Sequence, residues 1–452
     1  MVTVTAQSAF ASASTASATV TLTVNAAPGQ TAVPNTFFGS SVFGSCAGSI
    51  CDPSGQFPLL GGTSLGMLGK VGFTSWQYVE PSCDGGTNPS SSCYHWAQLD
   101  PWVNYAQANG MKLIYDVDVP PGWMCSQSPV CTVLPSNLTL VSNFATALAT
   151  KYKGRIQYYE TLNEIDQGGA WTGTCADLVL LHNTMRDAIK AADPNAVVGA
   201  PNVTGYSTPG TACDSSPVNA GTDSVLWMQN FLQTHDRNGS LPRVDTVGIH
   251  TYQIVQPALH NVAQRFLDVY NRLRAVMTAA GIPPSAPLLV TEGSFGPDSN
   301  NNCSSPLSST GCLTSAQQPA YVGRWLVLGA STWADGGGQL PSWYAYDIDW
   351  GTLNGSSGMN PQNATAYGQM EGWLTGAAFQ QQCHSGTPST VFVCDFTNGL
   401  GQPSEVIFND NNGSTTTYTV PSWATTYQPL LGNAQAISGG NVTVGDTPIL
   451  LE

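Results

Sequence analysis

The chain has 452 residues, a formal net charge of −15 and only 9% charged side chains. Its length fits one large α/β barrel with a small second domain. The 13 lysines and arginines are too few to neutralise many phosphate groups, which argues against nucleic acid or an anionic membrane as a partner. We expect a monomer that binds a neutral ligand. No apolar run reaches the roughly 18 residues that span a bilayer, and no signal-peptide pattern opens the chain, so we expect a soluble protein whose export signal has been removed.

Twelve cysteines lie mostly as close pairs in loops rich in glycine, serine and proline. The sequence predicts disulfides within the pairs Cys46 and Cys51, Cys83 and Cys93, Cys125 and Cys131, Cys303 and Cys312, and Cys383 and Cys394. Cys175 and Cys213 are left for a longer bridge, although spacing does not fix connectivity. A zinc site is the competing interpretation, but no Cys-x-x-Cys occurs and the histidines do not cluster near cysteines. The cysteines therefore predict an oxidising, extracellular location.

The N-terminal segment changes character at residue 18. Residues 1–17 are small and polar without helical period, which is typical of a linker or the end of a preceding module. Val20, Leu22 and Val24 then alternate with threonine, which predicts a strand within residues 18–30. We expect this strand to complete a C-terminal β-sandwich, because that later segment is short for an independent core.

Residues 31–376 alternate short β-branched or aromatic runs with helical patterns. The eight runs begin at residues 35, 72, 111, 155, 196, 244, 286 and 342. The clearest helical stripe is Phe266, Tyr270, Leu273 and Met277, and it stops before Gly281 and Pro283. This order predicts a (β/α)8 TIM barrel. A doubly wound open sheet is the alternative, weakened because no Gly-rich phosphate turn follows the first strand.

Beyond residue 376 the helical period disappears. Short runs such as "TVFVCDF", "EVIFND" and "TTTYTV" follow one another with turn residues between them. This pattern predicts a small antiparallel β-sandwich over residues 377–452.

Carboxylates stand at the ends of the predicted barrel strands, where the functional side chains of such barrels lie. Asn163 and Glu164 close the fourth strand, and Glu292 closes the seventh. Further acidic residues at strand ends are Glu80 on the second strand, Asp116 and Asp118 on the third, and Asp347 and Asp349 on the eighth. In a chain so poor in charge, these positions predict a site at the mouth of the barrel.

Two carboxylates facing each other across a barrel mouth suit the cleavage of a glycosidic bond. One acid protonates the leaving oxygen, and the other, about 5 to 5.5 Å away in retaining enzymes, attacks the anomeric carbon. We expect Glu164 to be the acid/base, because like-charge repulsion from an ionised Glu292 would raise its pKa. Asn163 is suited to hydrogen-bond a sugar 2-hydroxyl. This chemistry requires no metal or cofactor.

The Asn-Glu pair after strand four, the glutamate of "LLVTEGSF" after strand seven and "GIHTY" on strand six together resemble the retaining glycoside hydrolase superfamily called clan A. The chain is most similar in look to the β-xylosidase-like family 39, with the arabinofuranosidase and β-glucuronidase families behind it. The resemblance covers roughly residues 20–452. It implies Glu164 as acid/base, Glu292 as nucleophile, Asn163 on the 2-hydroxyl, and His250 or Tyr252 near the nucleophile.

Two departures from the clan's pattern bear on the site. Clan members usually have proline after Asn-Glu, whereas Ile165 follows here, so the loop after strand four is expected to differ in shape. The clan commonly has an arginine on strand two, whereas "SWQYVE" offers Gln77 and Glu80.

Aromatic side chains are expected to complete a sugar site, since the CH face of a pyranose stacks on aromatic rings. Candidates at or just after strand ends are Trp123, Trp343, Tyr346 and Trp350, each with core packing as the alternative. Asp118 is a candidate acceptor for sugar hydroxyl groups, and His250 lies just before the end of strand six.

The sequence favours a secreted retaining β-glycoside hydrolase that acts on a plant or microbial oligo- or polysaccharide, of β-xylosidase, β-glucosidase or endo-β-glycanase type. The alternatives are an arabinofuranosidase-type hydrolase and a catalytically silent, carbohydrate-binding barrel. A silent descendant would be expected to lose one carboxylate, and both Glu164 and Glu292 are present. A weaker hypothesis is a metal-assisted hydrolase using Asp116, Asp118 and His250, which lacks a second histidine at ligand spacing.

Overall fold

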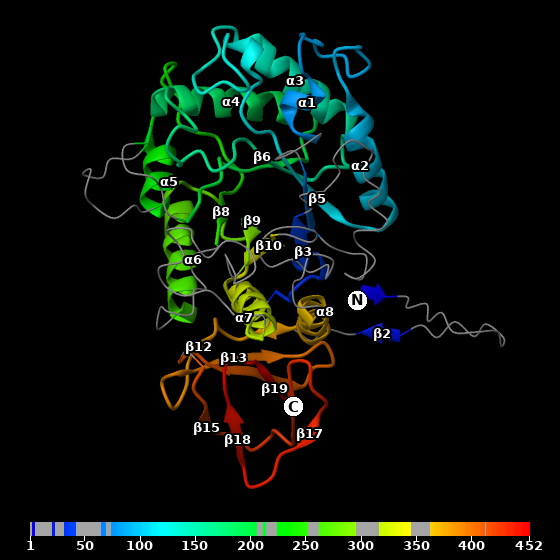
Figure 1. Cartoon of the computed structure of the whole chain (residues 1–452), viewed down its shortest axis with the longest axis vertical. Coiled ribbons are helices and arrows are strands. Elements are labelled where there is room, and N and C mark those ends of the chain that lie inside the picture. Colours follow the sequence, from blue (N-terminus) through cyan, green and yellow to red (C-terminus); the bar gives the residue numbers. More distant parts are fainter. Residues whose placement is uncertain are drawn as a thin grey trace, which may run out of the picture.

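The computed structural model describes residues 2–4, 20–22, 31–41, 65–68, 74–205, 211–213, 224–251, 262–294, 316–344, 362–411 and 413–452. These residues form a (β/α)8 barrel with an antiparallel β-sandwich beside it, as the sequence predicted (Figure 1). The sandwich lies next to α7 and α8 of the barrel, at the bottom of the view.

The barrel sheet contains eight parallel strands in the order β7-β6-β5-β4-β3-β10-β9-β8. They are β3 (Gly39–Ser41), β4 (Leu65–Leu68), β5 (Lys112–Asp116), β6 (Tyr158–Glu160), β7 (Val197–Val198), β8 (Gly248–His250), β9 (Leu288–Gly293) and β10 (Gln339–Trp343). The isolated parallel bridges Gly199–Thr246 and Val203–Ile249 join the β7 side to the β8 side. These bridges close the sheet into a ring, which rules out the open doubly wound sheet.

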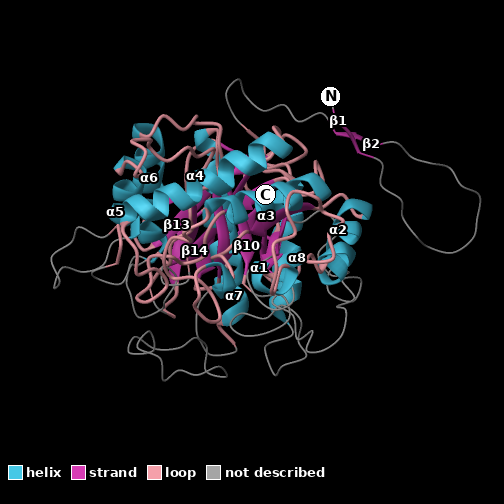
Figure 2. Cartoon of the chain, turned by 90° about the horizontal axis from the view of Figure 1, so that it is seen from above, coloured by secondary structure: helices cyan, strands magenta, loops and turns pink. Residues whose placement is uncertain are grey.

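Helices lie around the strands when the molecule is seen from above (Figure 2). They are α1 (Trp76–Val79), α2 (Leu99–Ala108), α3 (Leu138–Lys151), α4 (Cys175–Ala192), α5 (Ser224–Gln233), α6 (Val262–Ala279), α7 (Gln318–Ser331) and α8 (Gln362–Leu374). The predicted stripe on α6 is buried against the barrel. A capping box between Thr174 and Asp177 satisfies backbone N–H groups at the start of α4.

The second barrel strand was predicted at residue 72 and is instead β4, Leu65–Leu68. The aromatic run "SWQYVE" forms the single helical turn α1. Its buried residues are Trp76 and Val79, three positions apart, whereas a half-buried strand would bury alternate positions. The short "LGML" of β4 has no β-branched residue, contains one glycine and is followed by another, so its strand character was hidden in the sequence.

The C-terminal strands form two antiparallel sheets. One contains β11 (Ala378–Phe379), β12 (His384–Ser385), β13 (Val391–Thr397), β14 (Pro403–Asn409), β16 (Thr426–Pro429), β17 (Gln435–Ala436) and β19 (Ile449–Leu451). The other pairs β15 (Thr416–Thr419) with β18 (Asn441–Val444). Side chains of both sheets, including Val393, Ile407 and Val444, form a core of their own. Phe392, Phe408 and others instead belong to the core that extends into the barrel.

The N-terminal strand does not complete the sandwich, contrary to the prediction. β2 (Val20–Leu22) pairs antiparallel with β1 (Val2–Val4), within the segment predicted as a linker (Figure 1). The two segments carry the same alternation of apolar residues and threonine, so each supplies a partner for the other. The link between the start of the barrel and the sandwich is made further on, where the Val33 amide donates to the Ala377 carbonyl at 2.8 Å.

Four of the predicted disulfides are present: Cys83–Cys93, Cys125–Cys131, Cys175–Cys213 and Cys383–Cys394. The pairing of these eight cysteines is therefore confirmed, including the longer bridge. Cys46, Cys51, Cys303 and Cys312 lie outside the described residues. Among the described helices, none combines the length and the apolar character needed to cross a membrane.

Candidate active site

Two residues of the site lie on neighbouring strands at the mouth of the barrel. His250 is the last residue of β8, and Glu292 is the penultimate residue of β9. They are Cα partners in the parallel ladder. The six residues of β9 are all buried, so Glu292 is a carboxylate held by a rigid strand and only 3% exposed.

Glu164 comes to the same place from a bend four residues beyond the end of β6. The sequence placed it at the strand end itself. Its backbone has φ of 44°, a left-handed conformation that is uncommon outside glycine. The Glu164 amide donates to Oδ1 of Asn202 at 2.7 Å, and Nε2 of Gln167 donates to Glu164 Oε2 at 2.6 Å. The side chain is 23% exposed, so the carboxyl group is reachable from the mouth.

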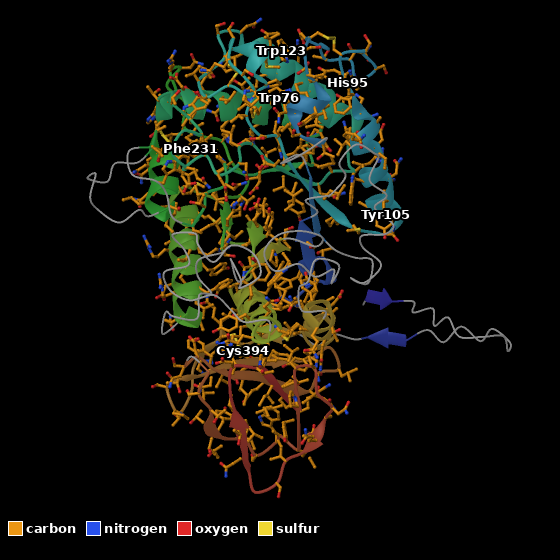
Figure 3. The ribbon with its side chains drawn as sticks, in the orientation of Figure 1. Trp76, His95, Tyr105, Trp123, Phe231 and Cys394 are labelled. Carbon is orange, nitrogen blue, oxygen red and sulfur yellow. A yellow bond between two sulfur atoms is a disulfide. The ribbon has the colours of Figure 1, made fainter. Side chains whose placement is uncertain are left out.

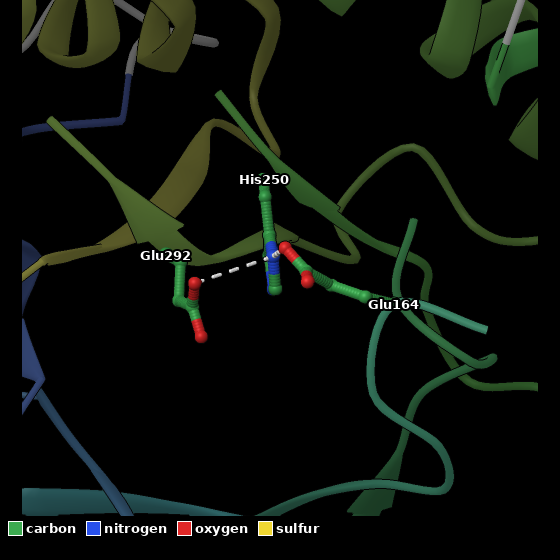
Figure 4. A group of neighbouring side chains, drawn as sticks. All are labelled: Glu164, His250 and Glu292. Carbon is green, nitrogen blue, oxygen red and sulfur yellow. Dashed lines mark hydrogen bonds and ion pairs between the residues drawn. The ribbon is translucent and has the colours of Figure 1, made fainter. Parts of the chain in front are cut away.

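His250 stands between the two glutamates (Figure 4). Its Nδ1 lies 2.7 Å from Glu164 Oε1 and 3.5 Å from Glu292 Oε2. A carboxylate oxygen of each glutamate and the ring nitrogen all lie within 4.8 Å of one another. The fold thus brings two carboxyl groups, 128 residues apart in the chain by their numbers, to a common point.

The hydrogen-bond network assigns the tautomer of His250. Both carboxylates face Nδ1, so Nδ1 carries a hydrogen and donates it to Glu164. On the other side of the ring, Nε2 lies 3.2 Å from Thr291 Oγ1, whose hydroxyl is able to donate to an unprotonated nitrogen. A fully buried imidazole with both nitrogens engaged has a fixed orientation.

The two neighbours of the Glu164 bend differ in what they contact. Asn163 Oδ1 is buried and has no hydrogen-bond partner in the described part of the chain. Asp166 instead accepts bonds from Thr204 and from Ser224, the first residue of α5. Burial raises the pKa of Asp166 to about 6, against the lowering effect of these bonds. Asp166 therefore secures the loop, whereas the Asn163 oxygen has no partner in the described part of the chain.

Asp116 and Asp118 occupy different environments. Asp116 is fully buried, and its Oδ1 accepts the Asp118 amide at 3.0 Å. Asp118 is half-buried with φ of 58°, and its own carboxylate accepts the Val119 amide at 2.7 Å. Of the two, Asp118 is the one open to solvent. The sequence did not single out Asn202, which contacts both Asp116 and the Glu164 bend, although it too lies at a strand end, in the run "AVVGAPNV".

The predicted aromatic platforms separate into two groups. Trp343 is fully buried and packs edge-on against Trp325, with ring centroids 5.2 Å apart. Trp123 donates from Nε1 to the Glu80 carbonyl and lies at the top of the molecule, away from β8 and β9 (Figure 3). The complete burial of Trp343 makes it a core residue, whereas Trp123 is partly exposed. Tyr252, Tyr346, Trp350, Asp347 and Asp349 lie outside the described residues.

Glu80 does not end a barrel strand, contrary to the prediction. It follows α1, where its carboxylate accepts from Trp76 Nε1 at 2.9 Å and from the Gly85 amide at 3.0 Å. Burial is the largest influence on this group and raises its pKa to about 7. Glu80 thus anchors the loop that the Cys83–Cys93 disulfide closes. Gln77, the other side chain offered in place of an arginine, lies on the same short helix rather than on a strand.

Glu164, His250 and Glu292 also have the ligand types and spacing that would hold a metal ion. Within the described ranges this is the only group of three acidic, histidine or cysteine residues with that property. The set predicted for a metal-assisted hydrolase, Asp116 and Asp118 with His250, does not form such a group. The hypothesis as the sequence framed it is therefore wrong.

The chain matches the family model for cellulase, glycosyl hydrolase family 5, over residues 73–302. Among solved structures it is similar to a family 39 glycoside hydrolase from Bacteroides cellulosilyticus WH2, at 15% identity and a TM-score of 0.58, covering 92% of this chain and 80% of that one. A family 44 xyloglucanase from Paenibacillus polymyxa has 13% identity, a TM-score of 0.54 and coverage of 95% and 98%. A family 51 arabinofuranosidase from Xanthomonas axonopodis pv. citri has 9% identity, a TM-score of 0.55 and coverage of 94% and 97%.

The barrel, its appended sandwich and these matches define the protein as a retaining glycoside hydrolase of clan A, as its motifs predicted. The family model covers half of the chain and includes Glu164, His250 and Glu292. The chain belongs to the cellulase family, glycosyl hydrolase family 5. The resemblance to family 39 is expressed in the shared fold.

Proposed function

We propose that Glu292 is the nucleophile and Glu164 the acid/base of a double displacement. The observation that carries this is the meeting of the two carboxylates within 4.8 Å at His250 Nδ1. Retaining enzymes hold their carboxyl groups about 5 to 5.5 Å apart, and the separation of about 6.5 to 9.5 Å in inverting enzymes leaves room for a water molecule. Glu292, on a rigid strand, suits attack on a fixed anomeric carbon. Glu164, more exposed and on a bend, suits contact with the departing sugar.

The two oxygens of Glu164 have different tasks in this proposal. Oε1 is held by the buried ring of His250, whereas Oε2 is contacted by Gln167, an exposed residue free to turn away. Oε2 therefore delivers the proton to the glycosidic oxygen. An ionised Glu292 favours the protonated form of Glu164 until the first step consumes its charge. The same oxygen then takes a proton from the water that hydrolyses the glycosyl-enzyme.

The remaining polar groups position the sugar. In this proposal Asn163 Oδ1, buried and without a partner in the described part of the chain, accepts from the sugar 2-hydroxyl, a contact that strengthens in the transition state. Asp118 accepts from a second hydroxyl. Tyr252, Tyr346 and Trp350 are our candidates for the remaining sugar contacts.

The substrate that we propose is a β-linked plant or microbial polysaccharide. The cellulase family model supports a β-glycan, and the related structures named above include a xyloglucanase. We propose that the protein is secreted, since four disulfides within the described residues need an oxidising compartment to form. Screening nitrophenyl glycosides and oligosaccharides of glucose, xylose, galactose and arabinose identifies the sugar, and the arabinose substrates test the arabinofuranosidase alternative.

Proton NMR of the first-formed product tests the mechanism. We expect the initial anomer to match the anomer of the substrate, because a covalent glycosyl-enzyme inverts the carbon twice. An initial product of opposite configuration would exclude Glu292 as nucleophile. Activity that survives chelator treatment separates this mechanism from metal-assisted hydrolysis at the same three residues.

The variant Glu164→Gln tests the acid/base role. We expect a loss of about 10²- to 10⁴-fold on substrates with poor leaving groups, because these need a proton in the first step. Aryl glycosides with activated leaving groups need none, so bond cleavage on them is expected to be largely retained. An equal loss on both kinds of substrate counts against Glu164.

A further inference from the structure

A buried polar cluster lies beneath the Glu164 bend and has no part in the double displacement. It consists of Asp116, Glu160 and Asn202, each fully buried. Asp116 and Glu160 end the neighbouring strands β5 and β6 and are Cα partners in the parallel ladder. Asn202 follows β7, so three successive strands of the barrel each supply one member.

Asn202 uses both ends of its amide in this cluster. Nδ2 donates to Glu160 Oε2 at 2.8 Å and to Asp116 Oδ2 at 3.3 Å. Its Oδ1 accepts the Glu164 backbone amide at 2.7 Å. Because a side-chain amide has donors on one end only, the two carboxylates fix its orientation. The oxygen must then face Glu164.

The cluster fits closely around this arrangement. A Cβ on Gly248 would lie 1.8 Å from Glu160 Oε1 and 3.1 Å from the Cβ of Asn202, so β8 needs glycine here. On the opposite side of the amide, Glu164 has its left-handed backbone. Such a conformation persists at a non-glycine residue where the surroundings hold it. The bond from the Glu164 amide to Asn202 is one direct source of that restraint.

We propose that Asn202, oriented by Asp116 and Glu160, is a positioning residue for the acid/base. This inference rests on the function proposed for Glu164. Asn202 does not touch the sugar: it fixes the backbone from which the Glu164 side chain extends. The carboxyl group then reaches His250 on one side and the departing oxygen on the other.

The variant Asn202→Asp tests this role with little change of shape. It replaces the donors with oxygens that face two carboxylates, so the side chain can no longer lock onto them and hold the Glu164 amide. We expect kcat/KM, which reports bond cleavage, to fall about 100-fold on substrates with poor leaving groups, the loss typical of a catalytic group displaced by about 1 Å. On activated aryl glycosides we expect kcat/KM to fall less than about 10-fold, because those need no proton transfer in bond cleavage.

A matched control exists in α4. Asn183 is also buried, donates to a carboxylate, Asp236, and accepts the backbone amide of Arg243 at 3.0 Å. Asn183→Asp changes the same chemistry on a helix of the outer ring. We expect it to lower the melting temperature as Asn202→Asp does, with the ratio of the two substrate activities unchanged.

The outcomes separate the two proposals. If Asn202→Asp reduces both substrate classes equally, or no more than Asn183→Asp does, the positioning role is wrong. If Glu164→Gln itself shows no dependence on the leaving group, the acid/base assignment fails instead. Should Asn202→Asp not fold, Asn202→Ser, which keeps a small acceptor and adds no charge, carries the same comparison with the same expected split.

Discussion

Two regions of the molecule bury charged side chains in opposite ways. Between barrel and sandwich, Arg324 of α7 is 2% exposed, lies 2.9 Å from Asp446 and 3.4 Å from Asp410, and also donates to the Asn409 carbonyl at 2.7 Å. Its guanidinium also covers the ring of Phe408. At the barrel mouth, two glutamate carboxyl groups instead converge on one ring nitrogen of His250.

The contrast indicates that the Arg324 cluster contributes to stability, whereas the glutamate pair at the mouth serves catalysis. In the Arg324 cluster unlike charges and backbone acceptors satisfy one another, so the cluster fastens the sandwich to the barrel. At the mouth, the fold holds two acidic groups so close that repulsion disfavours the ionisation of both, a cost that a purely structural site has no reason to bear. Substitutions at the mouth should therefore lower activity with little loss of stability, and substitutions in the Arg324 cluster should lower stability with little loss of activity.

The largest effect is expected from Glu292→Gln. Loss of the nucleophile should reduce kcat by about 10⁴-fold or more on every substrate, activated or not, since no covalent intermediate forms. The free energy of unfolding should be unchanged or higher, because the variant no longer buries an ionisable carboxyl group beside a second one. Steady-state kinetics and urea unfolding measure the two quantities. Glu405→Gln, at a buried glutamate of β14 in the sandwich, is the control and should leave kcat near that of the wild type.

Arg324→Met should show the reverse. Removing one partner from a buried ion cluster leaves carboxylates without their cation, so the free energy of unfolding should fall by about 3–5 kcal/mol. In the folded fraction, kcat/KM should stay within about twofold. Arg243→Met is the comparison, since Arg243 and Asp187 form an exposed pair worth about 0–1 kcal/mol. Equal losses of stability in both variants would contradict the role of burial.

Removing a disulfide should lower the free energy of unfolding by an amount that depends on the length of the loop it closes. Cys175–Cys213 closes 38 residues and ties the first residue of α4 to the loop after β7, whereas Cys125–Cys131 closes 6. Loop-closure entropy predicts that replacing the longer bridge with serines costs about 1.5 kcal/mol more than replacing the shorter one. Denaturant unfolding of the two double variants measures this difference. A larger cost for the short bridge would show that native contacts, rather than loop length, decide.

The sequence was sufficient for features that rest on local pattern. Residues close together in the sequence predict such features: the apolar run predicts strand β9, the apolar stripe predicts helix α6, and the close cysteine pairs predict disulfides. β4 was missed because "LGML" carries little β propensity and forms through its pairing with β5. The contact of Asn202 with Glu164 depends on the register of strands 38 residues apart in sequence, which no local pattern encodes.

Glu80 shows the same limit for a single residue. Its position near an apolar run predicted a strand end in the active site, and the packing of Trp76 turned that run into a helix. Glu80 instead accepts hydrogen bonds from Trp76 and Gly85 outside the active site, and burial there raises its pKa to about 7. It is therefore a third kind of buried charge, neither paired with a cation like Asp446 nor set against a second carboxylate at the mouth.

The remaining effect expected is the pH dependence that Glu80 gives to stability. Its pKa is raised from 4.5 to about 7 in the folded protein, chiefly by burial. Below pH 4.5 the carboxyl is protonated in both states. Between pH 4.5 and 7 the unfolded chain releases the proton while the folded one retains it, so stability is lost as pH rises through this window. The upper bound on this loss is about 3–4 kcal/mol, and the measured loss should be smaller because solvent entering the loop screens the charge.

Urea unfolding of the wild type and Glu80→Gln at pH 4.5 and 8 isolates the contribution of Glu80 to stability, because other titrating groups cancel in the difference between the two proteins. The wild type should lose more stability over this interval than the variant, and parallel pH dependence in the two would show that Glu80 is ionised throughout.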